Sequence, residues 1–262
     1  MDLNLKGKKA LVCGSSNGIG KASAEELARM GAEVTLFARN ADKLKKVCAA
    51  LSTAHGQTHH YLTADFDDLI GVENALTAFL QKQNGFDILV NNTGGPPAGP
   101  AHMAELDEYI TAFRRHLLCN QLITKLVLPQ MKNSENGRIV NVISTSVKAP
   151  LPNLGVSNTI RGAVGNWSKT LANELGAFGI TVNNVLPGAT ATGRLSSIIE
   201  NKANKTGKSA DEVSEAMTAE VPLKRFAEPA EVANAVAFLC SPAAAYISGI
   251  NLPVDGGRTP NL

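Results

Sequence analysis

The sequence predicts a doubly wound α/β domain, in which a parallel sheet is covered by helices on both faces. Short apolar runs rich in β-branched residues alternate with longer segments of helical spacing along almost the whole chain. The runs are continuously apolar, as is typical of parallel strands that are buried on both sides. No internal repeat divides the 262 residues, which suit one large domain, so we assign residues 1–262 to a single unit.

Each predicted strand is a run of apolar and β-branched residues that is too short to form a helix. Each predicted helix places apolar residues on related faces, and glycines such as Gly31 and Gly85 are positioned to end it. Strand and helix in regular alternation require right-handed crossovers between parallel strands. In chain order we expect strand 10–13, helix 18–30, strand 34–37, helix 68–83, strand 88–90, a long helix from 105 to 131, strand 139–143, helix 163–175, strand 180–185, helix 230–240 and strand 250–254.

One segment departs from this alternation. Residues 200–220 are polar and rich in Lys, Asn, Ser and Glu. We interpret them, within a wider stretch of about 189–225, as a mobile helical flap over the site and not as a linker between domains.

Composition excludes several classes of protein. Hydrophobic residues make up 44% of the chain and charged residues 18%, which allows a sizeable core and argues against disorder. The formal net charge of +2 argues against nucleic acid or an anionic membrane as the main partner. The first residues lack a secretion signal, and no window approaches the roughly 18 apolar residues of a membrane span. Four widely spaced cysteines are interpreted as free thiols, so we expect a soluble cytoplasmic protein.

Three glycines follow the first predicted strand, where the chain turns into the first helix. They are Gly14, Gly18 and Gly20. In a phosphate-binding turn the first glycine permits the sharp bend, the second lets the backbone approach a pyrophosphate, and the third lets the helix pack on the strand. The helix N-terminus offers unpaired N–H groups and a positive dipole end to the phosphates. The pattern favours a dinucleotide site, and an ordinary glycine-rich turn is the alternative.

The end of the second predicted strand indicates which dinucleotide is bound. An enzyme that uses NAD usually places a carboxylate there for the ribose 2′-hydroxyl, whereas an arginine suits the 2′-phosphate of NADP. Positions 37–40 hold no Asp or Glu, so Arg39, with Ser15 and Ser16, favours NADP (NADPH) over NAD. The alternative is that Arg39 is only a solvated charge.

Further motifs follow the glycine turn in order, up to about residue 257. They are Ala64-Asp65, Asn91-Asn92-Thr93-Gly94, Gly137-Arg138-Ile139-Val140 leading to Ser144, Val182-Asn183, Pro187-Gly188, Thr192, Gly249 and Val254-Asp255-Gly256-Gly257. Together these residues resemble the short-chain dehydrogenase/reductase family, and most of all its branch of 3-oxoacyl-(acyl-carrier-protein) reductases and their atypical relatives. The resemblance implies a single-domain Rossmann fold, a role in fatty acid metabolism, a small-molecule or acyl-thioester substrate and a homotetramer.

The resemblance also implies which residues line the dinucleotide. In such proteins the Asp65 position bonds the adenine, the Asn91 region lines the dinucleotide, and Pro187 to Thr192 flank the nicotinamide. The full expected set is Gly14, Ser15, Ser16, Asn17, Gly18, Ile19, Gly20, Arg39, Asn40, Asp65, Phe66, Asn91, Thr93, Gly94, Arg161, Pro187, Gly188, Thr190 and Thr192.

The catalytic device of the family is altered in this chain. It consists of a tyrosine, a lysine four residues later, a serine thirteen residues before the tyrosine, and an upstream asparagine. Aligned by spacing, the tyrosine position holds Ser157, the lysine position Arg161 and the asparagine position His116. Only Ser144 is retained, and no tyrosine lies within residues 110–245.

The substitutions have different chemical consequences. The hydroxyl of Ser157 is much less acidic than a tyrosine, whose pKa is roughly 10. Arg161 stays charged and cannot shuttle a proton, but its planar fork can hold the ribose hydroxyls. His116, with an unperturbed pKa of roughly 6.5, could protonate the alkoxide; the alternative is a packed, hydrogen-bonded side chain. The other histidines lack ligand partners at convincing spacing, so we expect no metal.

The loop 93–100 follows the fourth predicted strand, at the edge of the sheet where ligands bind. Its glycines and its Pro-Pro pair predict a rigid wall beside the nicotinamide, and a surface turn without contact is the alternative. We expect an NADP(H)-dependent oxidoreductase that reduces a 3-oxoacyl thioester or another activated ketone. Acid–base assistance contributes about 10²–10⁴-fold, so its loss weakens reduction and need not abolish it. The alternative function is a non-catalytic dinucleotide-binding sensor or regulatory protein.

Overall fold

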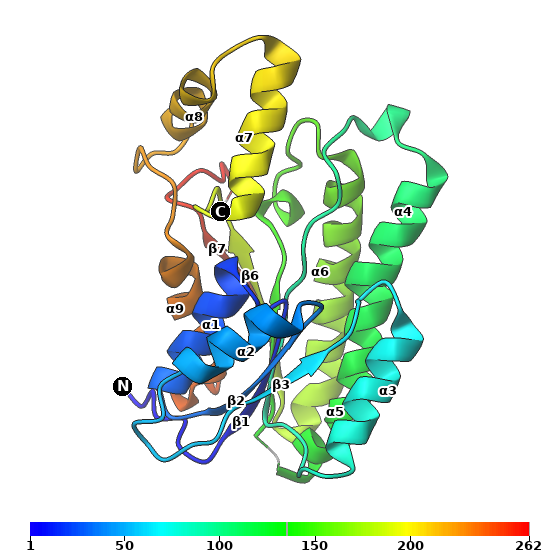
Figure 1. The fold of residues 1–262 in the computed structure, drawn as a ribbon, viewed down its shortest axis with the longest axis vertical. Helices are drawn as coiled ribbons and strands as arrows, with labels where there is room; N and C mark the ends of the chain where they lie inside the picture. The colour runs from blue at the N-terminus through cyan, green and yellow to red at the C-terminus, as the bar shows by residue number, and fades with distance from the viewer. Residues whose placement is uncertain (135, 262) are drawn as a thin grey trace.

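The computed structural model describes residues 1–134 and 136–261, and its centre is a sheet of seven parallel strands (Figure 1). The strands are β1 (Lys9–Cys13), β2 (Glu33–Ala38), β3 (His60–Thr63), β4 (Ile88–Asn91), β5 (Arg138–Val142), β6 (Thr181–Pro187) and β7 (Asn251–Val254). Their order across the sheet is β3-β2-β1-β4-β5-β6-β7. The order reverses between β1 and β4, and in open sheets ligands bind beyond the carboxyl ends of the strands at such a point.

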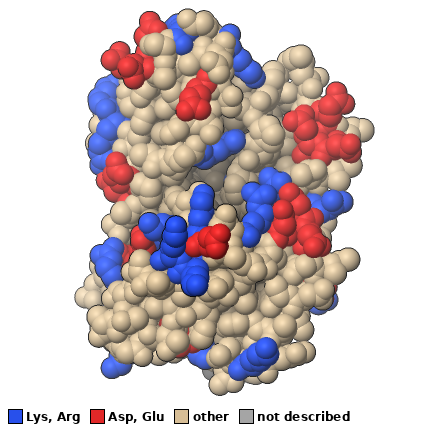
Figure 2. Space-filling model, viewed as in Figure 1, with Lys and Arg blue, Asp and Glu red and all other residues tan. Residues whose placement is uncertain are grey.

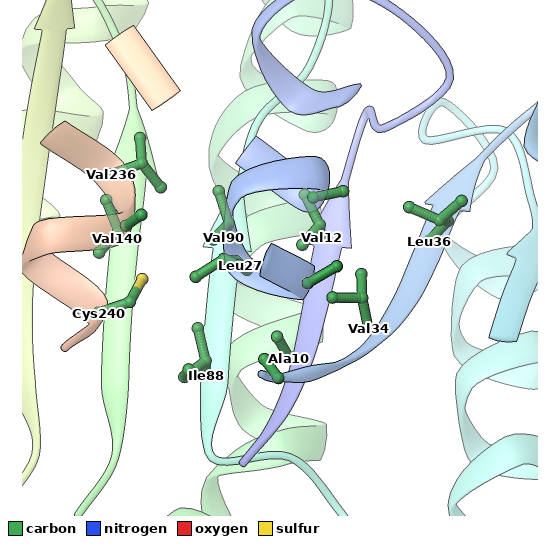
Figure 3. Packing of buried hydrophobic residues seen from close by; sticks show 14 of the residues in the cluster. Ala10, Val12, Leu27, Val34, Leu36, Ile88, Val90, Val140, Val236 and Cys240 are labelled. Carbon is green, nitrogen blue, oxygen red and sulfur yellow. The ribbon is translucent and has the colours of Figure 1, made fainter. Parts of the chain in front are cut away.

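Helices cover both faces of this sheet, which confirms the predicted single-domain, doubly wound α/β fold. One face carries α1 (Gly18–Arg29), α2 (Ala41–Ala50) and α9 (Pro229–Cys240), and the other carries α3 (Leu69–Leu80), α5 (Cys119–Ser134) and α6 (Gly155–Leu175). Successive residues of a strand point to opposite faces of the sheet. In β1, Ala10 and Val12 are buried in the core on one face, and Leu11 and Cys13 are buried in the core on the other. Figure 3 shows Leu27 of α1 close to Val12, over β1 and β4.

Two elements of the fold were not predicted from the sequence, and one helix begins earlier than predicted. Strand β3 lies at the edge of the sheet and alternates half-buried with exposed residues, so it lacks a continuous apolar run. Helix α2 buries only Leu44 and Val47 among charged neighbours. Helix α6 begins at Gly155 and not at 163, because Val156 and Ile160 are already buried in its first turns.

The long helix predicted from 105 to 131 is present but interrupted. Helix α4 (Leu106–Phe113) passes into a π-helical turn at Arg114–Leu118, from which α5 continues. Turns of π-helix within α-helices are rare and are frequent at functional sites. This turn carries His116, whose surface is only 2% exposed.

Four asparagines form a hydrogen-bonded row across the sheet. Asn91, Asn141, Asn184 and Asn251 are register partners on β4, β5, β6 and β7. Each Nδ2 donates to the next Oδ1, at 2.9 Å, 3.0 Å and 2.8 Å in that order. A slip of register would leave these amides without partners, so the row fixes how the strands pair near the carboxyl edge of the sheet.

Two helices stand beyond the carboxyl edge of the sheet (Figure 1). They are α7 (Gly193–Thr206) and α8 (Ala210–Ala219), and they occupy the stretch 189–225. Movement of this stretch as a flap stays a prediction. Within the part of the chain that the structure describes, no helix combines the length and the apolar character needed to cross a membrane.

Candidate active site

The glycine turn between β1 and α1 has a geometry that glycine suits. The φ angle is +60° at Gly14 and +55° at Gly18, in the left-handed region. A Cβ on Gly14 would lie 2.6 Å from the carbonyl oxygen of Asn92, and one on Gly20 would lie 2.3 Å from the carbonyl oxygen of Gly14. Side chains at these positions would therefore push the helix away from the strands.

The N-terminus of α1 is open to an outside ligand. Asn17 occupies the N-cap position and is exposed, but its side chain makes no capping hydrogen bond. Ser16 beside it is half-buried, and Ile19 packs against the core. The first turn of the helix therefore keeps N–H groups for an acceptor such as a phosphate.

Three residues of the expected dinucleotide set have side chains committed to the interior. Ser15 is buried, and its Oγ accepts a hydrogen bond from the N–H of Phe37 at 2.9 Å. Phe66 is buried edge-on against Phe37, with 5.2 Å between the ring centroids. Asn91 is buried in the asparagine row. Ser15 and Phe66 would therefore offer a dinucleotide their backbone and not their side chains, whereas Asn91 Oδ1 has no hydrogen-bond partner among the described residues.

The ends of β2 and β3 place charged groups side by side. Arg39 is exposed, and its Nη1 lies 3.4 Å from Oδ2 of Asp65. Asn40 Oδ1 accepts a hydrogen bond from the N–H of Lys43 at 2.9 Å and so caps α2. Arg39 and Asp65 therefore stand at the same corner of the carboxyl edge, where the sequence predicts the adenosine half of the dinucleotide.

The loop after β4 is tied to elements on both sides. Asn92 Nδ2 donates to the carbonyl oxygens of Cys13 and Gly14, at 3.4 Å and 3.3 Å. At the far end the N–H of Gly155 donates to the carbonyl oxygen of Gly99 at 2.9 Å. Asn92 holds the glycine turn against β4, a role that the sequence analysis did not assign to it.

Within this loop, Thr93 is half-buried and Gly94 is exposed. No heavy atom lies within 4 Å of the point where a Cβ on Gly94 would be, among the residues that the structure describes. The backbone at Gly94 is therefore open to a ligand on that side.

The segment after β6 faces the glycine turn from the opposite side. Thr190 is buried, and its Oγ1 donates to the carbonyl oxygen of Gly188 at 3.1 Å. Thr192 caps α7, because its Oγ1 accepts a hydrogen bond from the N–H of Leu195 at 3.4 Å. Thr192 Cγ2 lies 3.3 Å from the point where a Cβ on Gly18 would be. The two segments therefore border one space beyond β1 and β6.

Three of the four expected catalytic positions lie just after the carboxyl end of β5 and in the first turns of α6. Ser157 and Arg161 are one helical turn apart on α6 and share a face of that helix. Arg161 Nη1 donates to the carbonyl oxygen of Val142, the last residue of β5, at 3.2 Å. Ser144 follows shortly after, and its Oγ accepts from the N–H of Ser146 at 3.1 Å, which leaves its own proton for another acceptor.

His116, the fourth position, approaches from the π-helical turn. Burial and the charges of Arg161 and Arg115 lower its pKa to about 2. Its Nε2 is buried without a hydrogen-bond partner among the described residues. The ring is therefore neutral at neutral pH, which does not suit the predicted role as a protonated acid near neutrality.

An ion pair that the sequence analysis missed fixes this turn. Arg115 Nε donates to Asp67 Oδ1 at 2.7 Å, and its Nη2 pairs with the other carboxylate oxygen. The hydrogen bond to Arg115 holds the pKa of Asp67 below its usual value. The pair joins the π-helical turn to the loop after β3, and so links the catalytic side of the site to the side of Asp65.

A second arginine in the site was also missed. Arg194 lies in the first turn of α7 and donates from Nη2 to the carbonyl oxygen of Pro96 in the loop after β4. Burial and the charge of Arg194 lower the pKa of Arg161 to about 10, so Arg161 remains a cation at neutral pH. The only signal in the sequence was the position of Arg194, two residues after Thr192.

Comparison with known proteins places this geometry in context. Residues 14–259 match the profile of a protein family described as enoyl-(acyl carrier protein) reductase. The chain is 35% identical over 257 residues to a 3-oxoacyl-[acyl-carrier-protein] reductase of Vibrio cholerae, covering 97% of this chain and 98% of that protein.

Solved structures with the same fold include the L-sorbose reductase of Gluconobacter frateurii in complex with NADPH and L-sorbose. That structure has a TM-score of 0.93 and 30% identity, and the match covers 100% of both chains. YwfH, an NADPH-dependent reductase involved in bacilysin biosynthesis, has a TM-score of 0.91 and 28% identity over 97% of this chain and 99% of its own. The three similar proteins are reductases of different kinds.

Proposed function

The chain belongs to the short-chain dehydrogenase/reductase family, and on that premise we propose that it reduces a carbonyl group with NADPH as the hydride donor. The observation that carries the proposal is the glycine turn at the point where the strand order reverses. A Cβ on Gly14 or Gly20 would overlap a carbonyl oxygen, Gly18 has a left-handed backbone, and the N-terminus of α1 has no side-chain cap. This is the arrangement that a pyrophosphate requires.

The residues present fit NADPH. Arg39 is exposed at the end of β2, where a 2′-phosphate is expected, and no carboxylate occupies positions 37–40. Solved relatives of the same fold are an L-sorbose reductase bound to NADPH and an NADPH-dependent reductase. When bound, the reduced nicotinamide supplies the hydride that a carbonyl carbon receives.

The protein's own groups orient the substrate and stabilise charge on its oxygen. Ser144 donates a hydrogen bond to the carbonyl oxygen, since none of the residues that the structure describes accepts the proton of its hydroxyl. Arg161 is anchored through Nη1 to the carbonyl oxygen of Val142, and its Nε, which has no partner among the described residues, would hold the nicotinamide ribose and leave Nη2 for another acceptor. The oxygen takes its proton from water, because Ser157 is a weak acid and His116 is neutral at neutral pH. Ketone, NADPH and one proton thus become alcohol and NADP⁺.

The substrate is a 3-oxoacyl thioester or another activated ketone. The thioester is proposed because the similar protein of Vibrio cholerae is named as a 3-oxoacyl-[acyl-carrier-protein] reductase. An activated ketone is proposed because the catalytic residues are altered. A chain without the tyrosine loses acid–base assistance of about 10²–10⁴-fold, so it needs a more reactive carbonyl group. The sensor function considered from the sequence has no support from these relatives, which are enzymes.

Calorimetric titration with NADPH and with NADH, followed by turnover on a panel of ketones, tests the proposal. We expect tighter binding of NADPH and its consumption with an activated ketone. Gly20→Ala should weaken binding at least tenfold, because its Cβ would meet the carbonyl oxygen of Gly14. Gly162→Ala is the matched control, since this exposed helical position has no described heavy atom within 4 Å of the new Cβ. Binding without any consumption would favour the sensor instead.

A further inference from the structure

Two arginines from different helices border the loop after β4. The point where a Cβ on Gly95 would lie is 3.8 Å from Nη2 of Arg161 on α6 and 3.7 Å from Nη2 of Arg194 on α7. Figure 2 shows Lys and Arg side chains in and around a hollow near the N-terminal end of α7. Residue 95 therefore brings no side chain between the two guanidinium groups.

No carboxylate neutralises these two cations among the residues that the structure describes. Arg161 is 8% exposed, its Nη1 bonds to a backbone carbonyl, and its Nε has no partner. Arg194 makes its hydrogen bond to the carbonyl oxygen of Pro96 and not to an acid. Basic groups elsewhere, such as Arg115 and Arg225, form ion pairs with Asp or Glu. Like charges in a partly buried place are costly unless an anion joins them.

We propose that the ketone substrate carries a carboxylate, which binds between Arg161 and Arg194 beside Gly95. The inference rests on the proposed carbonyl reduction; it selects an oxo acid as the activated ketone and sets the 3-oxoacyl thioester aside. The two Nη2 atoms lie 3.7 Å and 3.8 Å from one point beside Gly95, so they are close enough together for the two oxygens of one carboxylate to bridge them through charge-assisted hydrogen bonds of about 2.7–2.9 Å. The N-terminus of α7 adds the positive end of its dipole on the same side.

The competing anion is a phosphate of the dinucleotide. Arg194 follows Thr192 by two residues, and Thr192 faces the glycine turn where the pyrophosphate is expected. Two observations favour the carboxylate. Arg194 is directed to Pro96 in the loop after β4, and it shares its space with Arg161, which reaches the end of β5. Both contacts lie on the side of Ser144, where the carbonyl is expected.

The test compares oxo acids with their uncharged methyl esters. With NADPH as donor, the activated ketones 2-oxobutanoate and 2-oxopentanoate are each paired with the methyl ester. We expect kcat/KM for the preferred acid to exceed that of its ester by about tenfold to a hundredfold, the usual effect of a hydrogen bond to a charged group. Arg194→Gln should bring this ratio close to one, and Arg194→Lys should retain part of it. Lys202→Gln, at an exposed position on the same helix, should leave the ratio unchanged.

Calorimetry separates the possible failures. If acids and esters are reduced equally well, or if Arg194→Gln weakens NADPH binding tenfold and leaves the ratio intact, the carboxylate site is refuted. If no ketone is reduced, carbonyl reduction itself fails, and titration of the NADP⁺ complex with the same acids and esters decides the site alone. Binding of an acid that Arg194→Gln abolishes would support the site, and equal binding or no binding of acid and ester would refute it.

Discussion

The buried His116 should make the free energy of unfolding depend on pH. Its pKa is about 2 in the folded protein against 6.5 as an ordinary histidine, so between these values the unfolded chain binds the proton and the folded one does not. Stability is therefore fully present above pH 6.5 and is lost as the pH falls. Between pH 7.5 and pH 5 this one group should cost about 2 kcal/mol of unfolding free energy.

Urea unfolding of the wild type and of His116→Gln at both pH values measures this loss. The variant cannot titrate at this position, so its stability should fall by about 2 kcal/mol less than that of the wild type over the same interval. Equal pH dependence in the two proteins would show that His116 titrates normally in the fold. The same neutral ring predicts that the pH profile of kcat/KM has no inflection from His116 between pH 5 and pH 8.

Ser157 decides how much of the family's acid catalysis is missing. Ser157→Tyr together with Arg161→Lys restores the family's residues, because a tyrosine with a pKa of roughly 10 becomes a better acid beside an ammonium group. We expect kcat on an activated ketone to rise by about a hundredfold, the lower end of the range for acid–base assistance. Thr159→Tyr, exposed on the same helix, controls for the added ring. An unchanged rate in the double variant would mean that the pocket has been rebuilt for different chemistry.

The site could be predicted from the sequence where one residue type alone satisfies the geometry. Gly14 and Gly18 need a left-handed backbone, and Gly20 needs the absence of a Cβ, so their pattern is visible in the chain. Arg194 was not predicted, because an arginine gains a role only when α7 packs beside the loop after β4. The pKa of His116 was equally hidden, since burial and a neighbouring cation come from the packing of the π-helical turn and α6.

At the scale of elements, we expect the asparagine row to contribute strongly to the free energy of unfolding. Asn141 is its centre, and it accepts from Asn91 and donates to Asn184 and to Ser168. Asn141→Ala would leave buried amide groups on two strands without partners, each at about 1–3 kcal/mol. We expect a loss of about 3 kcal/mol or more in unfolding free energy by urea titration.

Asn251→Ala is the matched control at the end of the same row. Asn251 is half-buried, so water can replace its contact with Asn184, and its loss should cost about 1 kcal/mol. If both variants lose the same free energy of unfolding, the buried amides of the row do not depend on their hydrogen bonds to one another. The row would then not fix the register of the strands.

The elements themselves followed from apolar periodicity wherever burial was two-sided. Each of the six predicted strands is present in the structure. Five of them are buried on both faces, and the sixth, β7, is the half-buried strand at the edge opposite to β3. Strand β3 and helix α2 were missed, because each exposes one side to solvent near the edge of the sheet and buries few residues. The π-helical turn could not be predicted, since Arg114–Leu118 carries no local signal that separates it from an α-helix.

At the scale of the whole molecule, an apolar stripe lies on the outside of α4. Leu106, Ile110 and Phe113 are 79%, 54% and 38% exposed, and they follow one another at helical spacing on one face. Apolar side chains that recur on one exposed face are typical of an interface between proteins. The homotetramer implied by the family resemblance would cover such a face with another copy of the chain.

Light scattering at micromolar concentration measures the assembly directly. We expect the mass of a tetramer for the wild type, and a smaller particle for Leu106→Glu with Ile110→Glu, because a charge buried at a symmetric interface is repeated in every copy and has no partner there. Thr111→Glu, an exposed position on the same helix but off the stripe, should leave the mass unchanged. A monomeric wild type would contradict the predicted tetramer. A double variant that still assembles would show that the interface does not involve α4.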